Sequence, residues 1–151
     1  IPKNITLVPI NFIEQELGAV LKEYGYFSNT KTFFIWEAVS QYLTETAVRQ
    51  TFNFLSQVPA GSRLTFTYVR KDFIEGKKLY VLEKSYDKII VKDNVWHFGF
   101  EPNELDSFLS EYGWRMVEHL GYDELAEHYM KPTGRELPFM TIERMVYAEK
   151  M

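Results

Sequence analysis

The feature that most constrains the fold of this chain is an alternation of strand-like apolar runs with amphipathic helical stretches. Residues 32–36 form an apolar run, which is typical of a parallel strand covered on both faces. A helical pattern begins at Thr44 and repeats apolar residues at spacings of three and four. Residues 64–69 then form another strand-like run, so the order of the segments predicts a doubly wound α/β sheet.

The segments on either side of this unit extend the same pattern. Residues 5–10 are short, apolar and β-branched, which predicts a buried strand that Pro9 brings to an end, and a helical pattern follows from Phe12. Residues 70–95 have weaker periodicity, and we interpret them as an inserted, partly helical lid. The remaining predictions are a helix at 105–112, a strand at 114–119, helical turns at 123–129 and a final strand at 142–148.

Composition limits the classes of function. An aromatic fraction of 17% and a hydrophobic fraction of 46% indicate a packed domain or a large piece of one. The net charge of −4 argues against binding to nucleic acid, and the absence of cysteine excludes disulfides and thiolate metal sites. The sequence contains no apolar run of about 18 residues, so we expect no membrane span and a cytoplasmic location.

Ligands of open α/β sheets bind beyond the carboxyl ends of the strands, so residues that follow predicted strands are the first candidates. Asn11 and Phe12 follow residues 5–10, and Glu37 follows residues 32–36. An amide beside an aromatic ring can hold an adenine, and a carboxylate can hold an ammonium group or a ribose hydroxyl. The alternative interpretation is structural, with Asn11 in a turn and Glu37 as a helix cap.

Ordered sequence blocks resemble the leucine carboxyl methyltransferase-like family of S-adenosylmethionine-dependent O-methyltransferases, in its bacterial and archaeal small-molecule branch. The similar blocks cover nearly the whole chain and comprise residues 7–12, 34–43, 59–64, 98–99, 104–105, 108–109, 113–114, 124–127, 132–135 and 142–144. The resemblance implies S-adenosyl-L-methionine as cofactor. It places Asn11 and Phe12 against the adenine, and Glu37 and Tyr42 near the methionine part. Asn11 stands where the family usually has aspartate, and Ala38 where it usually has glycine.

The glycine-rich turn and the ribose-binding acidic residue of such folds are not found in this sequence. The resemblance therefore implies the C-terminal part of a Rossmann-like class I methyltransferase sheet, lacking the first two strands. These would lie between residues 5–10 and residues 32–36. We expect residues 1–151 to form a single C-terminal fragment that pairs with the missing N-terminal half or forms a homo-oligomer, because its first strand has lost its neighbours.

Other chemistry has little support in the sequence. His97, His119 and His128 lack metal-ligand spacing, so no metal site is predicted, although His97 could line an acceptor pocket near the lid. No serine has a nucleophile-elbow context. No catalytic residue is assigned, because positioning can carry most of a methyl transfer. The leading hypothesis is O-methylation of a carboxylate or hydroxyl of a small molecule, with the fragment inactive alone. The alternative is a non-catalytic binding or interaction module derived from this fold.

Overall fold

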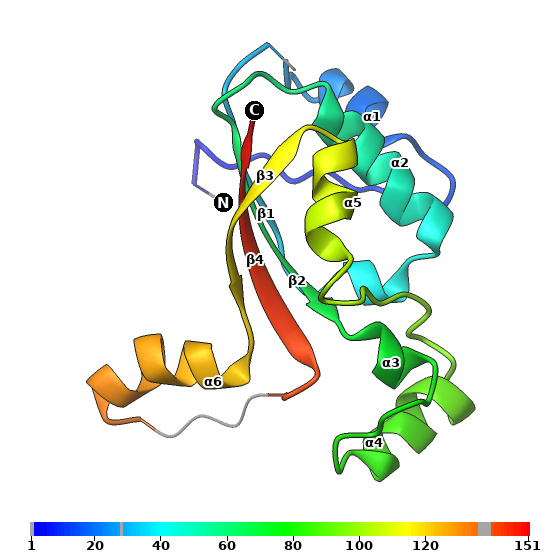
Figure 1. The fold of residues 1–151 in the computed structure, drawn as a ribbon. Helices are drawn as coiled ribbons and strands as arrows, with labels where there is room; N and C mark the ends of the chain where they lie inside the picture. The colour runs from blue at the N-terminus through cyan, green and yellow to red at the C-terminus, as the bar shows by residue number, and fades with distance from the viewer. Residues whose placement is uncertain (1, 28, 136–139) are drawn as a thin grey trace.

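The sheet is mixed and has four strands in the order β1-β2-β4-β3 (Figure 1). The computed structural model describes residues 2–27, 29–135 and 140–151. The strands are β1 (Phe33–Trp36), β2 (Arg63–Val69), β3 (Trp114–Leu120) and β4 (Glu143–Lys150). β1 and β2 are parallel, and β4 runs antiparallel to both β2 and β3. The α/β class and these four predicted strands are confirmed.

Short helices connect and cover the strands. The helices and helical turns are α1 (Leu17–Glu23), η1 (Ser40–Tyr42), α2 (Glu45–Ser56), α3 (Lys71–Ile74), α4 (Glu83–Tyr86), the π-helical η2 (Asp87–Lys92), α5 (Leu105–Glu111), α6 (Tyr122–Leu125), the π-helical η3 (Ala126–Met130) and η4 (Lys131–Thr133). α1, α2 and α5 gather on one side of the sheet (Figure 1).

The main core lies between the sheet and α2 and α5. Phe52 of α2 contacts Phe108 of α5 edge-on, with ring centroids 4.9 Å apart, and both belong to the same cluster as Phe66 of β2. The indole N–H of Trp114 donates to the Leu55 carbonyl oxygen over 3.2 Å, which satisfies a buried donor. Contacts between residues far apart in the sequence therefore hold α2 and α5 against the strands.

A second, smaller core lies beside the segment predicted as a lid. Val69, Phe73, Trp96 and Ile142 are buried there, and Tyr86 contacts Phe73 edge-on with ring centroids 5.5 Å apart. The segment contains α3, α4 and η2, so its partly helical character is confirmed. Its role as an inserted lid stays a prediction.

The prediction of a buried strand at residues 5–10 is wrong. These residues form no strand, and Ile5 and Leu7 are 50% and 67% exposed. The physical reason is that an isolated strand gains no ladder hydrogen bonds, so apolar, β-branched composition alone cannot hold it extended in a sheet.

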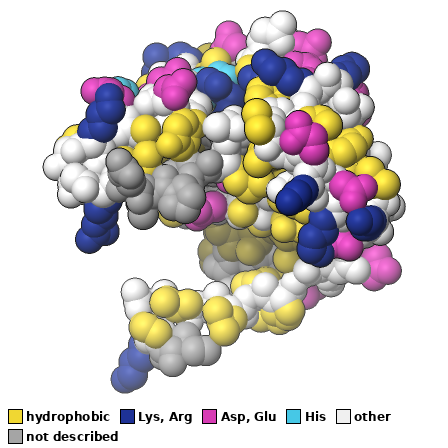
Figure 2. Space-filling view, turned by 90° about the horizontal axis from the view of Figure 1, so that it is seen from below, with side chains coloured by type: hydrophobic (Ala, Val, Ile, Leu, Met, Phe, Trp, Pro, Cys, Tyr) yellow, Lys and Arg dark blue, Asp and Glu magenta, His cyan; other side chains and the backbone are white. Residues whose placement is uncertain are grey.

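In the view from below, hydrophobic side chains gather along a hollow between the main body and a smaller projecting part (Figure 2).

Candidate functional site

The turn after β1 carries two of the predicted cofactor residues, Glu37 and Tyr42. The Ala38 N–H donates to Thr67 Oγ1 over 2.8 Å, and Ser40 Oγ donates to the Thr67 carbonyl oxygen over 3.2 Å. These bonds hold the turn against β2 at the carboxyl end of the parallel pair. Glu37 is exposed there, and its carboxylate has no hydrogen bond or ion pair among the described residues. It is available to a positively charged or hydroxyl-bearing ligand.

Ala38 occupies a backbone conformation that favours glycine. Its φ is +53°, in the left-handed region where a Cβ crowds the following carbonyl oxygen. The glycine that the resembling family usually has at this position would adopt this φ without that cost. Alanine at this position therefore keeps the left-handed backbone conformation at the cost of local strain.

The segment around Tyr42 contains aromatic rings and two buried polar atoms. The Tyr42 ring is half-exposed and meets Trp96 edge-on, with centroids 6.2 Å apart. Trp36 Nε1 and Gln41 Oε1 are buried, and neither has a hydrogen-bond partner among the described residues. Because buried polar atoms are normally paired, this donor and this acceptor fit a site whose hydrogen bonds are completed by a bound molecule or by water.

Asn11 and Phe12 lie in a separate turn at the entrance to α1. Asn11 Oδ1 accepts from the Ile13 N–H over 3.0 Å, and the Asn11 N–H donates to Gln15 Oε1 over 2.8 Å. The turn interpretation of Asn11 therefore describes its local structure. Its side-chain nitrogen has no hydrogen bond among the described residues, so it can donate to a ligand. Phe12 is half-buried and packs against the main core.

The four predicted residues thus occupy two places in the fold. Glu37 and Tyr42 share one turn, whereas Asn11 and Phe12 share another, and no interaction among the described residues joins the two pairs. Their roles in binding stay predictions.

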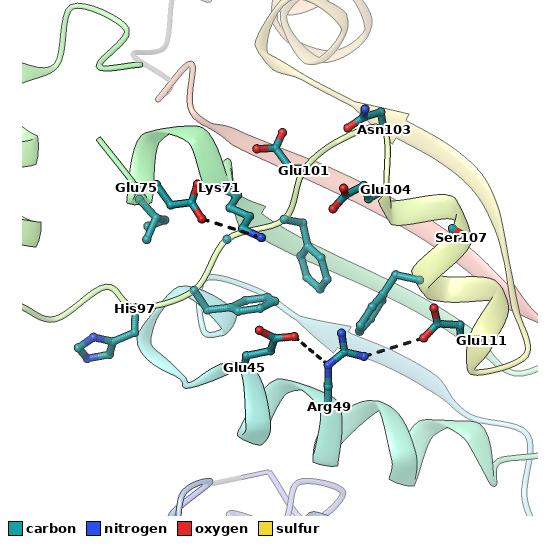
Figure 3. Close-up of a pocket in the computed structure, with 15 residues that line it drawn as sticks. Glu45, Arg49, Lys71, Glu75, His97, Glu101, Asn103, Glu104, Ser107 and Glu111 are labelled. Carbon is teal, nitrogen blue, oxygen red and sulfur yellow. Dashed lines mark hydrogen bonds and ion pairs between the residues drawn. The ribbon is translucent and has the colours of Figure 1, made fainter. Parts of the chain in front are cut away.

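A cavity of about 660 Å³ opens between α2, α3, α5 and residues 97–104, which lead into α5 (Figure 3). It combines aromatic and acidic side chains, namely Phe98, Phe100, Phe108, Glu45, Glu75, Glu101, Glu104 and Glu111, with the cations Arg49 and Lys71. Arg49 lies between two of the carboxylates, with Nε 2.9 Å from Glu45 Oε1 and Nη1 3.9 Å from Glu111 Oε2 (Figure 3). The cavity is net acidic.

Of the cavity residues, only His97 was considered for a pocket from the sequence, and it does line this one. The His97 N–H donates to the Gln41 carbonyl oxygen over 2.7 Å, which joins the cavity wall to the turn after β1. The remaining residues come from distant segments, so no local motif identifies them. The one available signal was the aromatic cluster Phe98-Gly99-Phe100 followed by glutamate.

A partly buried polar cluster connects β2, β3 and β4. The Tyr68 hydroxyl lies 2.8 Å from His119 Nε2, and Arg144 Nε donates to the same nitrogen over 3.0 Å. Burial and the charge of Arg144 lower the pKa of His119, and burial strongly raises the pKa of Tyr68. Since Arg144 is a donor only, His119 Nε2 accepts, and the imidazole is neutral with its proton on Nδ1.

The start of the 70–95 segment carries a second polar cluster. Arg70 donates to Asp72 through two nitrogens, at 3.2 and 2.9 Å, and the Tyr80 hydroxyl donates to Asp72 over 2.5 Å. Burial disfavours the Asp72 carboxylate, but the hydrogen bonds from Arg70 and Tyr80 outweigh it and lower the pKa of Asp72. These contacts hold the segment against the end of β2.

The described residues contain neither a cluster of metal ligands nor a membrane-spanning helix. No three histidine, aspartate or glutamate side chains are grouped as metal ligands among residues 2–27, 29–135 and 140–151. In the same part of the chain, no helix has the length and hydrophobicity needed to cross a membrane.

Comparison with solved structures defines the class of fold. A SAM-dependent methyltransferase from Methanosarcina mazei superposes with a TM-score of 0.50 at 11% identity, over 82% of this chain and 60% of that chain. A DUF574 family protein from Streptomyces avermitilis also gives a TM-score of 0.50, at 14% identity over 79% of this chain and 44% of that chain. The fold is of the α/β kind found in SAM-dependent methyltransferases.

Sequence comparison finds relatives among methyltransferases. The leucine carboxyl methyltransferase family model matches residues 1–56. The Bacillus subtilis protein named "Putative S-adenosyl-L-methionine-dependent methyltransferase YktD" is 29% identical over 99% of this chain. Both matches support the resemblance to the leucine carboxyl methyltransferase-like family that the sequence blocks indicated. This chain spans 50% of the length of YktD.

Proposed function

We propose that the protein contributes to an S-adenosyl-L-methionine-dependent O-methyltransferase acting on a hydroxyl or carboxylate of a small molecule. The observation that carries the proposal is the free carboxylate of Glu37 at the carboxyl end of β1, inside the segment that matches the family model. Asn11, Phe12 and Tyr42 lie in the same matched segment. Gln41 Oε1, a buried acceptor in η1 that has no partner among the described residues, supports a bound polar molecule beside the turn.

When bound, S-adenosyl-L-methionine supplies an electrophilic methyl group on a positively charged sulfur. Glu37 would accept hydrogen bonds from the ammonium group of the methionine part, and the half-exposed Tyr42 ring would flank it. The free side-chain nitrogen of Asn11 would donate to the adenine edge, and Phe12 would contact its face. These residues hold and orient the cofactor rather than transfer protons.

The chemistry needs positioning more than a dedicated base. Glu37, Tyr42, Asn11 and Phe12 would hold the cofactor, and the cofactor would supply its methyl group to an acceptor oxygen. We infer that the acceptor binds in the cavity beside the turn. Its five glutamates outnumber Arg49 and Lys71, which favours a neutral or cationic acceptor with a hydroxyl over an anionic carboxylate.

The test is calorimetric titration of S-adenosyl-L-methionine into residues 1–151 and into Glu37→Gln. Loss of the carboxylate should weaken binding about 10- to 100-fold, because a hydrogen bond between charged groups contributes about 1.5–3 kcal/mol. Glu23→Gln is the matched control, since Glu23 is an exposed glutamate of α1 and should leave the affinity unchanged.

Equal affinities for the two variants would contradict the role of Glu37.

The second candidate function, a non-catalytic module, is favoured by the strain at Ala38 and by the Asn11 oxygen already engaged with Ile13. It is supported if the wild-type chain binds no S-adenosyl-L-methionine up to millimolar concentration.

A further inference from the structure

One wall of the cavity is aromatic, and its position depends on a single glycine. A Cβ atom at Gly99 would lie 2.6 Å from the Val69 carbonyl oxygen, so only glycine lets this segment run so close to the end of β2. The rings of Phe98 and Phe100 on either side have centroids 4.7 Å apart, and the Phe100 ring lies 4.9 Å from that of Phe108. We call these three rings the aromatic wall. Together they form a continuous apolar surface against which a ligand ring can pack.

The cations of the cavity already have partners. Arg49 is paired with Glu45 and Glu111, and Lys71 Nζ lies 3.9 Å from Glu75 Oε1. An anionic ligand that took either cation would leave a carboxylate of the cavity without its partner. The cavity is therefore poorly suited to an anion.

Two further carboxylates of the cavity have no partner. Glu101 and Glu104 line it, and neither carboxylate has a hydrogen bond or ion pair among the described residues. Figure 3 shows them across the cavity from Glu45 and Arg49. The uncompensated negative charge thus lies on the side where the chain enters α5, and it attracts a cation to that side.

The position of the proposed cofactor residues gives the ligand an orientation. The His97 N–H donates to the carbonyl oxygen of Gln41, the residue before Tyr42, so the His97 side of the cavity adjoins the turn after β1. A hydroxyl that receives a methyl group must face this side. Figure 3 shows His97 on a different side of the cavity from Glu101 and Glu104, so the part of the ligand away from its hydroxyl lies near the two free carboxylates.

We propose that the cavity binds a phenolic amine, with its ring against the aromatic wall and its ammonium group at Glu101 and Glu104. An ammonium group donates the hydrogen bonds that the two carboxylates lack, and it is attracted by their charge. A cavity of about 660 Å³ is large enough for a ligand of this size. The inference deepens the proposed function and rests on it, because it takes the phenolic amine to be the methyl acceptor.

The test compares probes that share a phenol ring and differ in charge. Tyramine carries an ammonium group, para-ethylphenol is neutral, and para-hydroxyphenylacetate is an anion. In calorimetric titrations into residues 1–151 without S-adenosyl-L-methionine, tyramine should bind at least about tenfold more tightly than para-ethylphenol, and the anion should bind most weakly. Added salt should weaken the binding of tyramine but not of para-ethylphenol, because salt screens charges near the surface.

Variants separate the charge from the ring contact. The double variant Glu101→Gln and Glu104→Gln should remove the advantage of tyramine over para-ethylphenol. Glu118→Gln is the matched control, since Glu118 is an exposed glutamate of β3 that does not line the cavity. Phe98→Leu should weaken both probes by the same factor, because it removes one ring of the aromatic wall and leaves both carboxylates in place.

Tyramine that binds no more tightly than para-ethylphenol, or does not bind, would overturn the inference. A preference for tyramine that persists in the double variant would overturn it as well. Failure of the proposed function is a different result, because that function is tested with S-adenosyl-L-methionine and Glu37→Gln. If S-adenosyl-L-methionine binds and tyramine shows no preference, the phenolic amine is wrong and the cofactor site stands.

Discussion

Ala38 has a left-handed backbone conformation, which a residue with a Cβ atom disfavours. The turn that presents Glu37 is held by hydrogen bonds to Thr67, and these bonds keep Ala38 at a φ of +53°. A left-handed conformation costs a residue with a Cβ about 1–2 kcal/mol, and glycine avoids that cost. The turn is therefore maintained by its tertiary contacts against a local preference.

We predict that Ala38→Gly raises the free energy of unfolding by about 0.5–1 kcal/mol. The gain is the relief of strain, reduced by the greater freedom of glycine in the unfolded chain. Urea denaturation measures it. Ala60→Gly is the control, because Ala60 lies in an exposed turn without a positive φ and should lose stability. A loss in both variants would show that the Ala38 turn is not strained.

His119 gives the chain a pH-dependent contribution to stability. Burial and Arg144 lower its pKa in the folded state, with Arg70 acting in the same direction and Glu124 opposing it. The unfolded chain then binds more protons below a pH of about 6.5, so this contribution is present above that pH and lost as the pH falls. Protonation would also place a cation against Arg144 and remove the acceptor for Tyr68.

We predict that the free energy of unfolding falls between pH 7 and pH 5, and that His119→Phe removes part of this slope. Denaturation curves at several pH values measure it. His128→Asn is the control, because His128 is exposed on η3 and should leave the slope unchanged. The Asp72 carboxylate also has a lowered pKa, but its contribution is lost only at more acidic pH. An identical slope in the wild type and His119→Phe would contradict the role given to His119.

At the scale of elements, α2 links the candidate site to the core. Its inward residues pack on the sheet, and its first turns carry Glu45 and Arg49 into the cavity. Thr44 begins the helix, with its side-chain oxygen accepting from the Ala47 N–H over 3.2 Å. The position of this helix end therefore affects both stability and the shape of the cavity.

Thr44→Ala should lower the free energy of unfolding by about 1 kcal/mol, because an N-cap hydrogen bond is lost. Thr46→Ala is the matched control, since Thr46 is exposed within the helix and alanine has the higher helix propensity. Thermal denaturation followed by circular dichroism compares the two. If Thr46→Ala is the more damaging change, Thr44 is not the effective cap.

At the scale of the whole molecule, β1 lies at the edge of the sheet and pairs with β2 among the described residues. We predict that residues 1–151 show no methyl transfer from radiolabelled S-adenosyl-L-methionine to a panel of small hydroxyl and carboxyl compounds. The two turns that carry Asn11 and Glu37 would hold only the adenine and the methionine part of the cofactor. Without a glycine-rich loop beside the ribose, the methyl group is not fixed at attack distance. Turnover by the isolated chain above the rate in buffer would refute this.

Local pattern was enough to determine much of the architecture. The apolar runs at 32–36 and 64–69, the stripe from Thr44 onward and the later strands each became the predicted element, because their side-chain periodicity matches the face they bury. Ordered blocks also indicated a resemblance to the leucine carboxyl methyltransferase family, which the match of residues 1–56 supports. Residues 5–10 had a suitable pattern but formed no strand, because a strand exists only where another strand supplies its hydrogen bonds.

The sequence by itself determined the α/β class, the order of most elements and the family resemblance, all of which depend on residue periodicity and on blocks of neighbouring residues. Tertiary structure alone decided the sign of φ at Ala38, the partly buried cluster of Tyr68, His119 and Arg144, and the cavity between α2 and α5. Each of these depends on contacts between residues far apart in the chain, and such contacts follow from how strands and helices pack rather than from any local pattern.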